Sequence, residues 1–236
     1  MGNNGSERPS VTGHQDPPGE APWAMQMVAR VDKEEPPALA GLLEAAGAAV
    51  VTLLADGRSD GDGPWADEVD RWLSGRIRKV VRRARGSAWE RVQEVPGVTV
   101  ERRGAEVRAL VPGPTDAVPA EVRKLQLSGF VTSDDELPSM LSPPRRWPGL
   151  VVAVNPGLEL SPGKLAAQVA HATNLAWMQM GRRRLDAWEE SGFVIAVCRP
   201  DERRWRAFVT GAPVVVADAG FTEVAPGTQT TAAYWD

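Results

Sequence analysis

The 236-residue sequence contains a single cysteine and only two histidines. One cysteine cannot form a disulfide within the chain, and Cys198 lies in the apolar run FVIAVC, which is typical of a buried strand. His14 falls in a polar segment far from His171, so a histidine metal site is not expected. The sequence therefore favours neither a disulfide framework nor a metalloprotein, and we expect no metal and no cofactor.

Strong net charge and long apolar runs are also missing. The formal net charge is −4, which does not favour attraction of the whole molecule to nucleic acid. No apolar run approaches the roughly 20 residues of a membrane-spanning helix, and the N-terminus lacks the apolar core of a signal peptide. We therefore expect a soluble cytoplasmic protein without a membrane partner.

Composition divides the chain into four parts. Residues 1–22 are rich in Gly, Pro, Asn and Ser, so we expect them to be disordered. Beyond them, two groups of strand and helix signals are separated by a linker at 133–148 that contains several prolines. We predict one domain at 23–132 and a second at 149–236.

Apolar periodicity and turn residues predict the elements of both domains. In the first domain they predict strands at Met25–Val31, Ala48–Leu54, Val98–Val100 and Val107–Val111, and helices at Pro37–Ala46, Trp65–Arg85 and Glu121–Leu127. In the second they predict strands at Leu150–Val154, Phe193–Cys198, Val214–Ala217 and Gln229–Trp235, and helices at Gly163–Met180, Arg182–Glu190 and Asp201–Thr210. This alternation indicates an α/β layer structure with a largely covered sheet.

The helix predicted from Gly163 carries one polar stripe. Lys164, Gln168 and His171 stand at i, i+4 and i+7, on a single helical face that begins at the N-terminus. Helix N-termini favour anions, so the stripe suits a substrate with phosphates or a developing oxyanion. The alternative is the solvated polar face of a surface helix.

The sequence also matches itself. Gly75–Trp89 parallels Gly163–Trp177 at an offset of 88 residues, and the same offset relates Pro112 to Pro200 without a gap. Chance matches occur in helices rich in Ala and Arg, but one offset across a helix and a strand favours an internal duplication. We therefore predict two related halves.

The first copy lacks the polar stripe, since the matching positions hold Arg76, Val80 and Arg83. Arginine keeps a charge but does not readily lose a proton, and valine has no amide. Chemistry is therefore predicted in the second half.

The C-terminal segment supplies a carboxylate and several hydroxyls. Asp218 stands at the end of a predicted strand, where ligands bind in open α/β sheets. Gly220 allows a close turn, and Thr222, Thr228 and Thr230 offer hydroxyls around the same loop. The alternative is ordinary turn chemistry without a site.

Two motifs together resemble the archaeal and eukaryotic type of peptidyl-tRNA hydrolase: GKLAAQVAHA at residues 163–172 and DAGFTEVAPGTQT at residues 218–230. The resemblance covers residues 150–235. It implies a small mixed sheet flanked by helices, frequent homodimers, and cleavage without a metal of the ester that joins a peptide to the 3′ ribose of tRNA. Peptidyl-tRNA is then the expected partner, and the two related halves are expected to form a pseudo-dimer.

The resemblance also implies a set of site residues. The family's catalytic positions fall on Lys164, Asp218, Thr222 and Thr230, and substrate-binding positions are expected at Gln168, His171, Gly220, Thr228 and Gln229. Ester cleavage needs an activated water and a stabilised oxyanion. We expect Asp218 to act on the water and Lys164 on the oxyanion or a phosphate, and His171 to be either a proton shuttle or a structural hydrogen-bonding residue.

The sequence departs from the family at three places. Phe221 replaces a usually basic residue, Glu223 replaces a glutamine, and Ser161-Pro162 stands where a second lysine is common. Missing cations weaken affinity for a polyanion. The alternative function is therefore an inactive RNA-binding or regulatory module with the same fold.

A dense basic stretch, RIRKVVRRAR, lies in the first half. On a helix it grips phosphates at several points, so possible RNA contacts are predicted at Arg76, Arg78, Lys79, Arg82 and Arg83. The alternative is a solvated helix whose charge is masked by the acidic loop before it.

Overall fold

The computed structural model describes residues 19–139, 147–218 and 223–236. In the first half the elements are β1 (Trp23–Arg30), α1 (Leu39–Ala55), α2 (Ala66–Leu73), β2 (Arg78–Ala84), α3 (Ser87–Val92), β3 (Gly97–Arg102), β4 (Ala105–Leu110), β5 (Gly113–Pro114) and α4 (Ala120–Arg123). In the second half they are β6 (Leu150–Val154), α5 (Pro162–Gln179), α6 (Arg182–Glu190), β7 (Ile195–Cys198), α7 (Glu202–Gly211), β8 (Val214–Ala217) and β9 (Gln229–Tyr234).

The two sheets have the same topology. The first has the strand order β2-β1-β4-β3, with β5 also paired to β1, and the second has the order β7-β6-β9-β8. In each sheet the first two strands of that order are parallel and the other pairs are antiparallel. The prediction of a mixed α/β fold with two related halves is confirmed.

The predicted alignment of the halves is wrong. Gly75–Trp89, expected to match helix α5, instead contains strand β2 and the start of α3. By topology β2 corresponds to β7, and these strands begin at residues 78 and 195, which is not an offset of 88. This segment is a strand because β2 pairs in parallel with β1 along its whole length. Such tertiary pairing overrides the helix propensity of an Arg-rich segment.

Helix α1 also differs from its prediction, which ended a helix at Gly47 and placed a strand at Ala48–Leu54. The structure has one helix from Leu39 to Ala55 that runs through Gly47. Every residue from Gly41 to Val51 is buried, so the helix is enclosed on all sides. A continuous apolar run does not distinguish a buried strand from a buried helix, which explains the wrong prediction.

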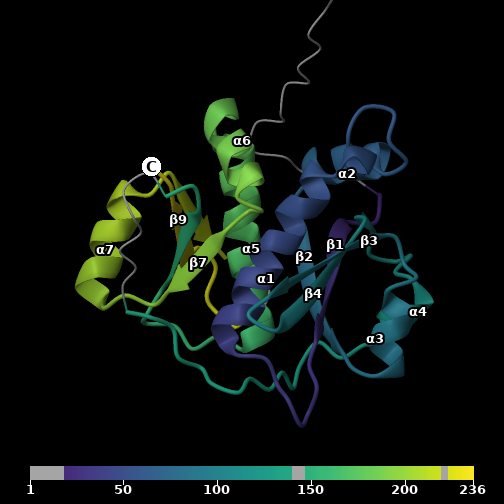
Figure 1. Ribbon diagram of the computed structural model, residues 1–236, viewed down its shortest axis with the longest axis horizontal. Coiled ribbons are helices and arrows are strands. Elements are labelled where there is room, and N and C mark those ends of the chain that lie inside the picture. Colours follow the sequence, from purple (N-terminus) through teal and green to yellow (C-terminus); the bar gives the residue numbers. More distant parts are fainter. Residues whose placement is uncertain (1–18, 140–146, 219–222) are drawn as a thin grey trace, which may run out of the picture.

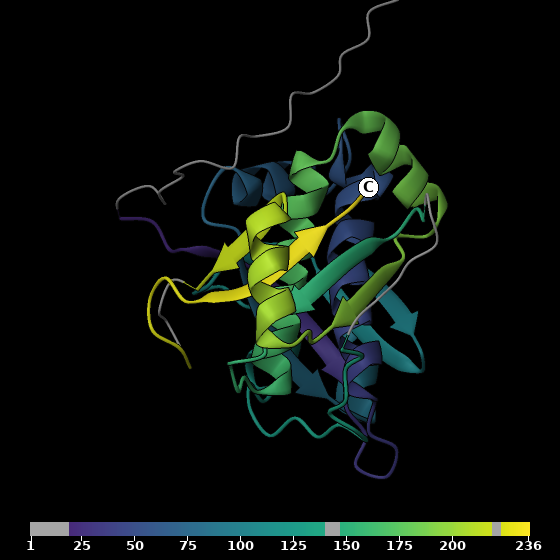
Figure 2. The same ribbon diagram turned by 90° about the vertical axis from the view of Figure 1, so that its left-hand side faces the viewer.

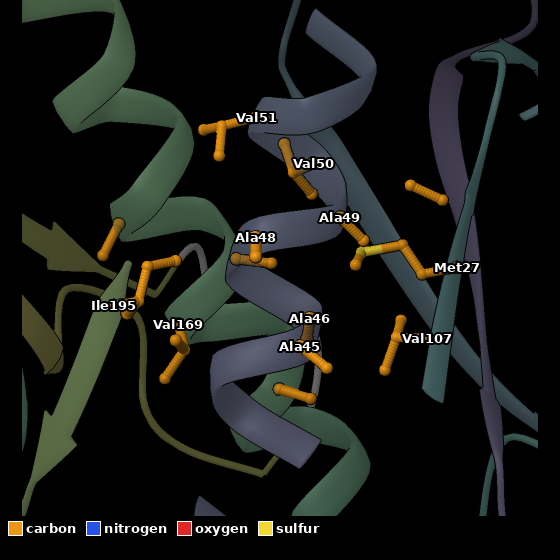
Figure 3. Packing of buried hydrophobic residues seen from close by; sticks show 14 of the residues in the cluster. Met27, Ala45, Ala46, Ala48, Ala49, Val50, Val51, Val107, Val169 and Ile195 are labelled. Atoms are coloured by element: carbon orange, nitrogen blue, oxygen red, sulfur yellow. The ribbon is translucent and has the colours of Figure 1, made fainter. Parts of the chain in front are cut away.

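Helices α1 and α5 lie side by side between the two sheets (Figure 1). Figure 3 shows Ala49 of α1 turned toward Met27 and Val107 of the first sheet, while Ala48 lies toward Val169 and Ile195 of the second half. Small residues let the helix backbones approach closely. One central core therefore contains residues of both halves.

The outer face of each sheet has its own cover. Helices α3 and α4 pack on the first sheet through a cluster that includes Trp89 and Val122. Helix α7 covers the second sheet through Trp205 (Figure 2). In the described ranges, no helix is long and apolar enough to cross a membrane.

The predicted domain boundaries stay a prediction. The strands of the first sheet lie between residues 23 and 114, and those of the second between 150 and 234. Most of the predicted disordered tail lies outside the described residues. Where the description begins, Glu20 forms an ion pair with Arg71, and the Pro22 carbonyl accepts a hydrogen bond from the Thr115 amide.

The thiol of Cys198 is expected to be unreactive in the folded protein. Cys198 is buried beside Trp205, and burial raises its pKa to about 11. Because the thiolate is the reactive form, we expect no reaction with a disulfide reagent at about pH 8, and complete reaction after denaturation. Modification of the native protein at the rate of a free thiol would contradict this burial.

Candidate active site

The first turn of α5 and the end of β8 bring a lysine and a carboxylate together. Pro162 is tolerated at the start of α5, where no intrahelical bond needs its missing N–H, and Lys164 follows two residues later. The Nζ atom of Lys164 lies 2.8 Å from Oδ2 of Asp218. Their side chains are 15% and 4% exposed, so this ion pair is largely withdrawn from water.

Gln168 extends this pair into a chain of contacts. Its Nε2 donates a hydrogen bond of 2.7 Å to Oδ2 of Asp218, and its Oε1 accepts one of 2.7 Å from the Thr230 hydroxyl. Because both ends of the amide have partners, the orientation of Gln168 is fixed. Four predicted site residues, from α5, β9 and the end of β8, therefore meet: Lys164, Gln168, Asp218 and Thr230.

Thr231 supports the same helix turn and was not predicted. Its hydroxyl donates to the Gln168 carbonyl at 3.3 Å, and its side chain is fully buried. Thr231 belongs to the TQTT run at the start of β9. The spacing of the threonines in this run does not show which hydroxyl bonds to the neighbouring helix, so the sequence contains no signal for Thr231.

The backbone holds Asp218 at the base of its loop. The Asp218 amide donates to the Thr228 carbonyl at 2.9 Å, and the Gly227 amide donates to the Asp218 carbonyl at 2.8 Å. Gly227 has a φ of 81°, a conformation that favours glycine. Thr228 is half-buried, whereas the Gln229 side chain is exposed.

Four residues of the second motif, Ala219, Gly220, Phe221 and Thr222, lie outside the described residues. Within the described ranges, no group of three or more His, Cys, Asp or Glu residues is placed to hold a metal ion. The described site residues Lys164, Asp218, Gln168 and Thr230 supply an ammonium group, a carboxylate, an amide and a hydroxyl.

His171 continues the α5 stripe beyond Gln168. Its Nδ1 lies 3.4 Å from Nζ of Lys79 in the first half. Burial and the Lys79 charge lower the His171 pKa to about 3, against the smaller opposing effect of Asp218. The imidazole is therefore neutral near pH 7 and does not begin a reaction as a protonated acid.

The basic stretch does not form the predicted helical face. On strand β2, Lys79 turns toward α5, while Arg82 donates to the Leu125 carbonyl at 2.9 Å and Arg83 donates to the Ser128 carbonyl at 2.7 Å. Arg76 is exposed and Arg78 is half-buried. Strand geometry distributes alternate side chains to opposite faces, so these five cations do not form one continuous surface.

A second acidic side chain lies at the N-terminus of α5. Glu223 accepts hydrogen bonds from the Ser161 amide at 2.8 Å and the Ser161 hydroxyl at 2.7 Å. Ser161 is the N-cap residue of α5, a position that favours negative charge. Glu223 therefore occupies the place where the sequence predicted an anion of the substrate.

Comparisons with known proteins point to one family. The family model described as "Peptidyl-tRNA hydrolase PTH2" matches residues 149–234. A peptidyl-tRNA hydrolase of Halobacterium salinarum is 34% identical over 90 residues, which cover 35% of this chain and 80% of the relative. One of Thermoplasma volcanium is 37% identical over 91 residues, covering 34% of this chain and 78% of the relative.

The chain therefore belongs to the peptidyl-tRNA hydrolase 2 family. The human mitochondrial peptidyl-tRNA hydrolase 2 is 35% identical over 91 residues, which cover 34% of this chain and 51% of the relative. The chain thus spans about half the length of this relative and of its bovine counterpart. The motifs that carry the predicted resemblance lie within the matched range.

Proposed function

We propose that the protein hydrolyses the ester between a peptide and the 3′ ribose of tRNA, as an aminoacyl- or peptidyl-tRNA ester hydrolase that needs no metal. The observation that carries the proposal is the contact chain from Lys164 through Asp218 and Gln168 to Thr230. A buried carboxylate held by a cation and an amide is suited to orient and deprotonate a water molecule.

Each side chain has a role in this mechanism. Asp218 takes the proton from the attacking water, and Gln168 and Lys164 hold its Oδ2 in place. The Lys164 ammonium has further N–H donors for the oxyanion of the tetrahedral intermediate or for a phosphate of the tRNA 3′ end. Thr230 fixes Gln168, and we assign Thr222, Gly220, Thr228 and Gln229 to substrate contacts of the same loop.

The test is incubation of the purified full chain with an N-acetylated aminoacyl-tRNA in the presence of a chelator. Repeated release of the N-acetyl amino acid together with tRNA that keeps its 3′ end supports the proposal. A second candidate is a regulatory or RNA-binding module without turnover; the loss of activity is favoured by Phe221, which stands where the family has a cation, and by Glu223, which occupies the helix N-terminus where a substrate anion would bind. Binding of the tRNA without release of the amino acid supports that candidate.

Glu223→Gln is expected to lower KM for the acylated tRNA by about threefold to tenfold, because it removes a negative charge from a site facing a polyanion. The glutamine carbonyl still accepts a hydrogen bond from Ser161. Glu159→Gln, an exchange at an exposed carboxylate in the loop before α5, is the matched control and is expected to change KM less. An unchanged KM for Glu223→Gln would show that the substrate phosphates do not bind near the N-terminus of α5.

We further propose that the two halves are a fused pair in which only the second keeps the site. The shared topology and the packing of α1 against α5 support this pseudo-dimer. Fusion replaces a concentration-dependent association by an intramolecular one, so the first half is free to lose its own site residues. The protein is then expected to keep its activity at dilutions that separate a homodimer.

A further inference from the structure

Lys79 is a predicted RNA-contact residue whose side chain reaches the second half of the chain. Its Nζ donates to Oδ1 of Asn174 at 2.8 Å and lies 3.4 Å from Nδ1 of His171, both on α5. The same ammonium donates to the Ile77 carbonyl at 3.3 Å and lies 4.8 Å from the centre of the Trp72 ring. Three polar groups therefore surround this nitrogen: two carbonyl oxygens that accept from it, and Nδ1 of His171, whose role depends on the tautomer of the imidazole.

These partners distinguish Lys79 from an ordinary salt-bridged lysine. Within the described part of the chain, none of the hydrogen-bond partners of Lys79 is a carboxylate. Burial lowers its pKa well below the usual range. A lysine held without a counter-charge costs stability, and a methionine fills similar space without that cost, so packing alone does not account for an ammonium here.

Through His171, Lys79 is connected to the proposed catalytic stripe. His171 is three residues beyond Gln168 on the same helix, and Gln168 binds the Asp218 carboxylate. A neutral imidazole has one donor and one acceptor nitrogen, so an N–H donor at Nδ1 leaves the proton on Nε2. The first half thereby selects which nitrogen of the stripe donates.

We propose that Lys79 is a positioning residue of the site, which holds His171 with Nδ1 as hydrogen-bond acceptor and the proton on Nε2. This inference rests on the proposed function for its effect on catalysis, but its structural part does not. It gives the first half a definite task, because the site of the second half then depends on a side chain from strand β2.

The charged groups that act on His171 come from three elements. Burial and Lys79 of β2 lower its pKa, a hydrogen bond with the Ile77 backbone and the Asp218 carboxylate raise it, and Lys164 of α5 lowers it. Removing the Lys79 ammonium therefore removes one of the charges that keep the imidazole neutral. Lys79→Met keeps most of the length of the stem and removes the charge and the donors.

The experiment is nitrogen-15 NMR of the imidazole in the full chain. The sequence has two histidines, so His14→Gln leaves His171 as the only reporter. In this background we expect the Nε2–H tautomer with no titration between about pH 5 and 8. Lys79→Met is expected to mix the tautomers at pH 7, and a titration extended down to about pH 3 is expected to show an apparent pKa raised by about one unit or more. Lys124→Met, at an exposed lysine, is expected to change neither.

Two NMR results would overturn the proposal: the Nδ1–H tautomer in the protein with Lys79 intact, or a folded Lys79→Met variant with unchanged tautomer and titration. The first needs no variant of Lys79, so it decides even where Lys79→Met does not fold. In the hydrolysis assay, Lys79→Met is expected to lower kcat about tenfold with KM nearly unchanged. Absence of turnover by the protein with Lys79 intact would overturn the proposed function. The NMR result would still decide the role of Lys79.

Discussion

Asp218→Asn is expected to lower kcat for an N-acetylated aminoacyl-tRNA by about 100-fold or more, because the variant loses the general base. KM is expected to stay the same or to fall, since losing a negative charge does not weaken the binding of a polyanion. Asparagine still accepts hydrogen bonds from Lys164 and Gln168, so the geometry of the site is retained better than with alanine. The measurement is steady-state kinetics of ester cleavage.

Asp201→Asn is the matched control. Asp201 is the exposed N-cap of α7, where its side chain accepts a hydrogen bond from the Arg204 amide, and asparagine caps helices equally well. This variant is expected to keep both kcat and KM. Because Asp218→Asn also leaves Lys164 without a buried counter-charge, thermal unfolding of both variants shows whether the loss of activity is a loss of fold. A folded Asp218→Asn with full activity would remove Asp218 from the mechanism.

Gly47→Val is expected to destabilise the protein by about 1–3 kcal/mol, because α1 has no room for a side chain at this position. A Cβ at residue 47 would lie 2.7 Å from Oγ1 of Thr173 and 2.7 Å from Cδ1 of Ile195, both in the second half. The helices or the Ile195 side chain must shift to relieve these contacts. Chemical denaturation followed by circular dichroism measures the change.

Gly211→Val provides the comparison for this glycine. Gly211 is also helical and exposed, at the end of α7, and a Cβ there meets no atom within 4 Å. Its substitution is expected to change stability by less than about 0.5 kcal/mol. Equal effects of the two substitutions would contradict the close packing of the two halves at α1.

The second half could be predicted from sequence because its elements have clear local limits. Strand β6 and helix α6 have the predicted bounds, and so does β8, because turn residues flank each of them. Asp201 was placed as the first residue of a helix and is the N-cap of α7. Lys164 and Asp218 were predicted from two motifs. Lys164 lies at the start of a predicted helix and Asp218 at the end of a predicted strand, and in an α/β fold these positions share one edge of the sheet.

The first half was harder because its elements are defined by contacts that are distant in sequence. The sequence pattern of β2 is helical, and only its pairing with β1 makes it a strand. The pattern of α1 predicts a helix followed by a strand, and the segment is one helix because α5 and the first sheet enclose it. Lys79 and His171 are 92 residues apart in the sequence, so no local pattern predicts their contact. The duplication was inferred from a false alignment, yet the topology has two related halves.

The central claim, that the Lys164–Asp218 pair cleaves an ester of tRNA, is tested most directly by a single-turnover experiment. The protein is held in excess over N-acetylated aminoacyl-tRNA, and the released N-acetyl amino acid is followed after rapid quenching. We predict an exponential release that goes to completion and that Lys164→Met slows by about 100-fold or more. A stable complex with an intact ester, or equal rates for the protein with and without Lys164→Met, would contradict the claim.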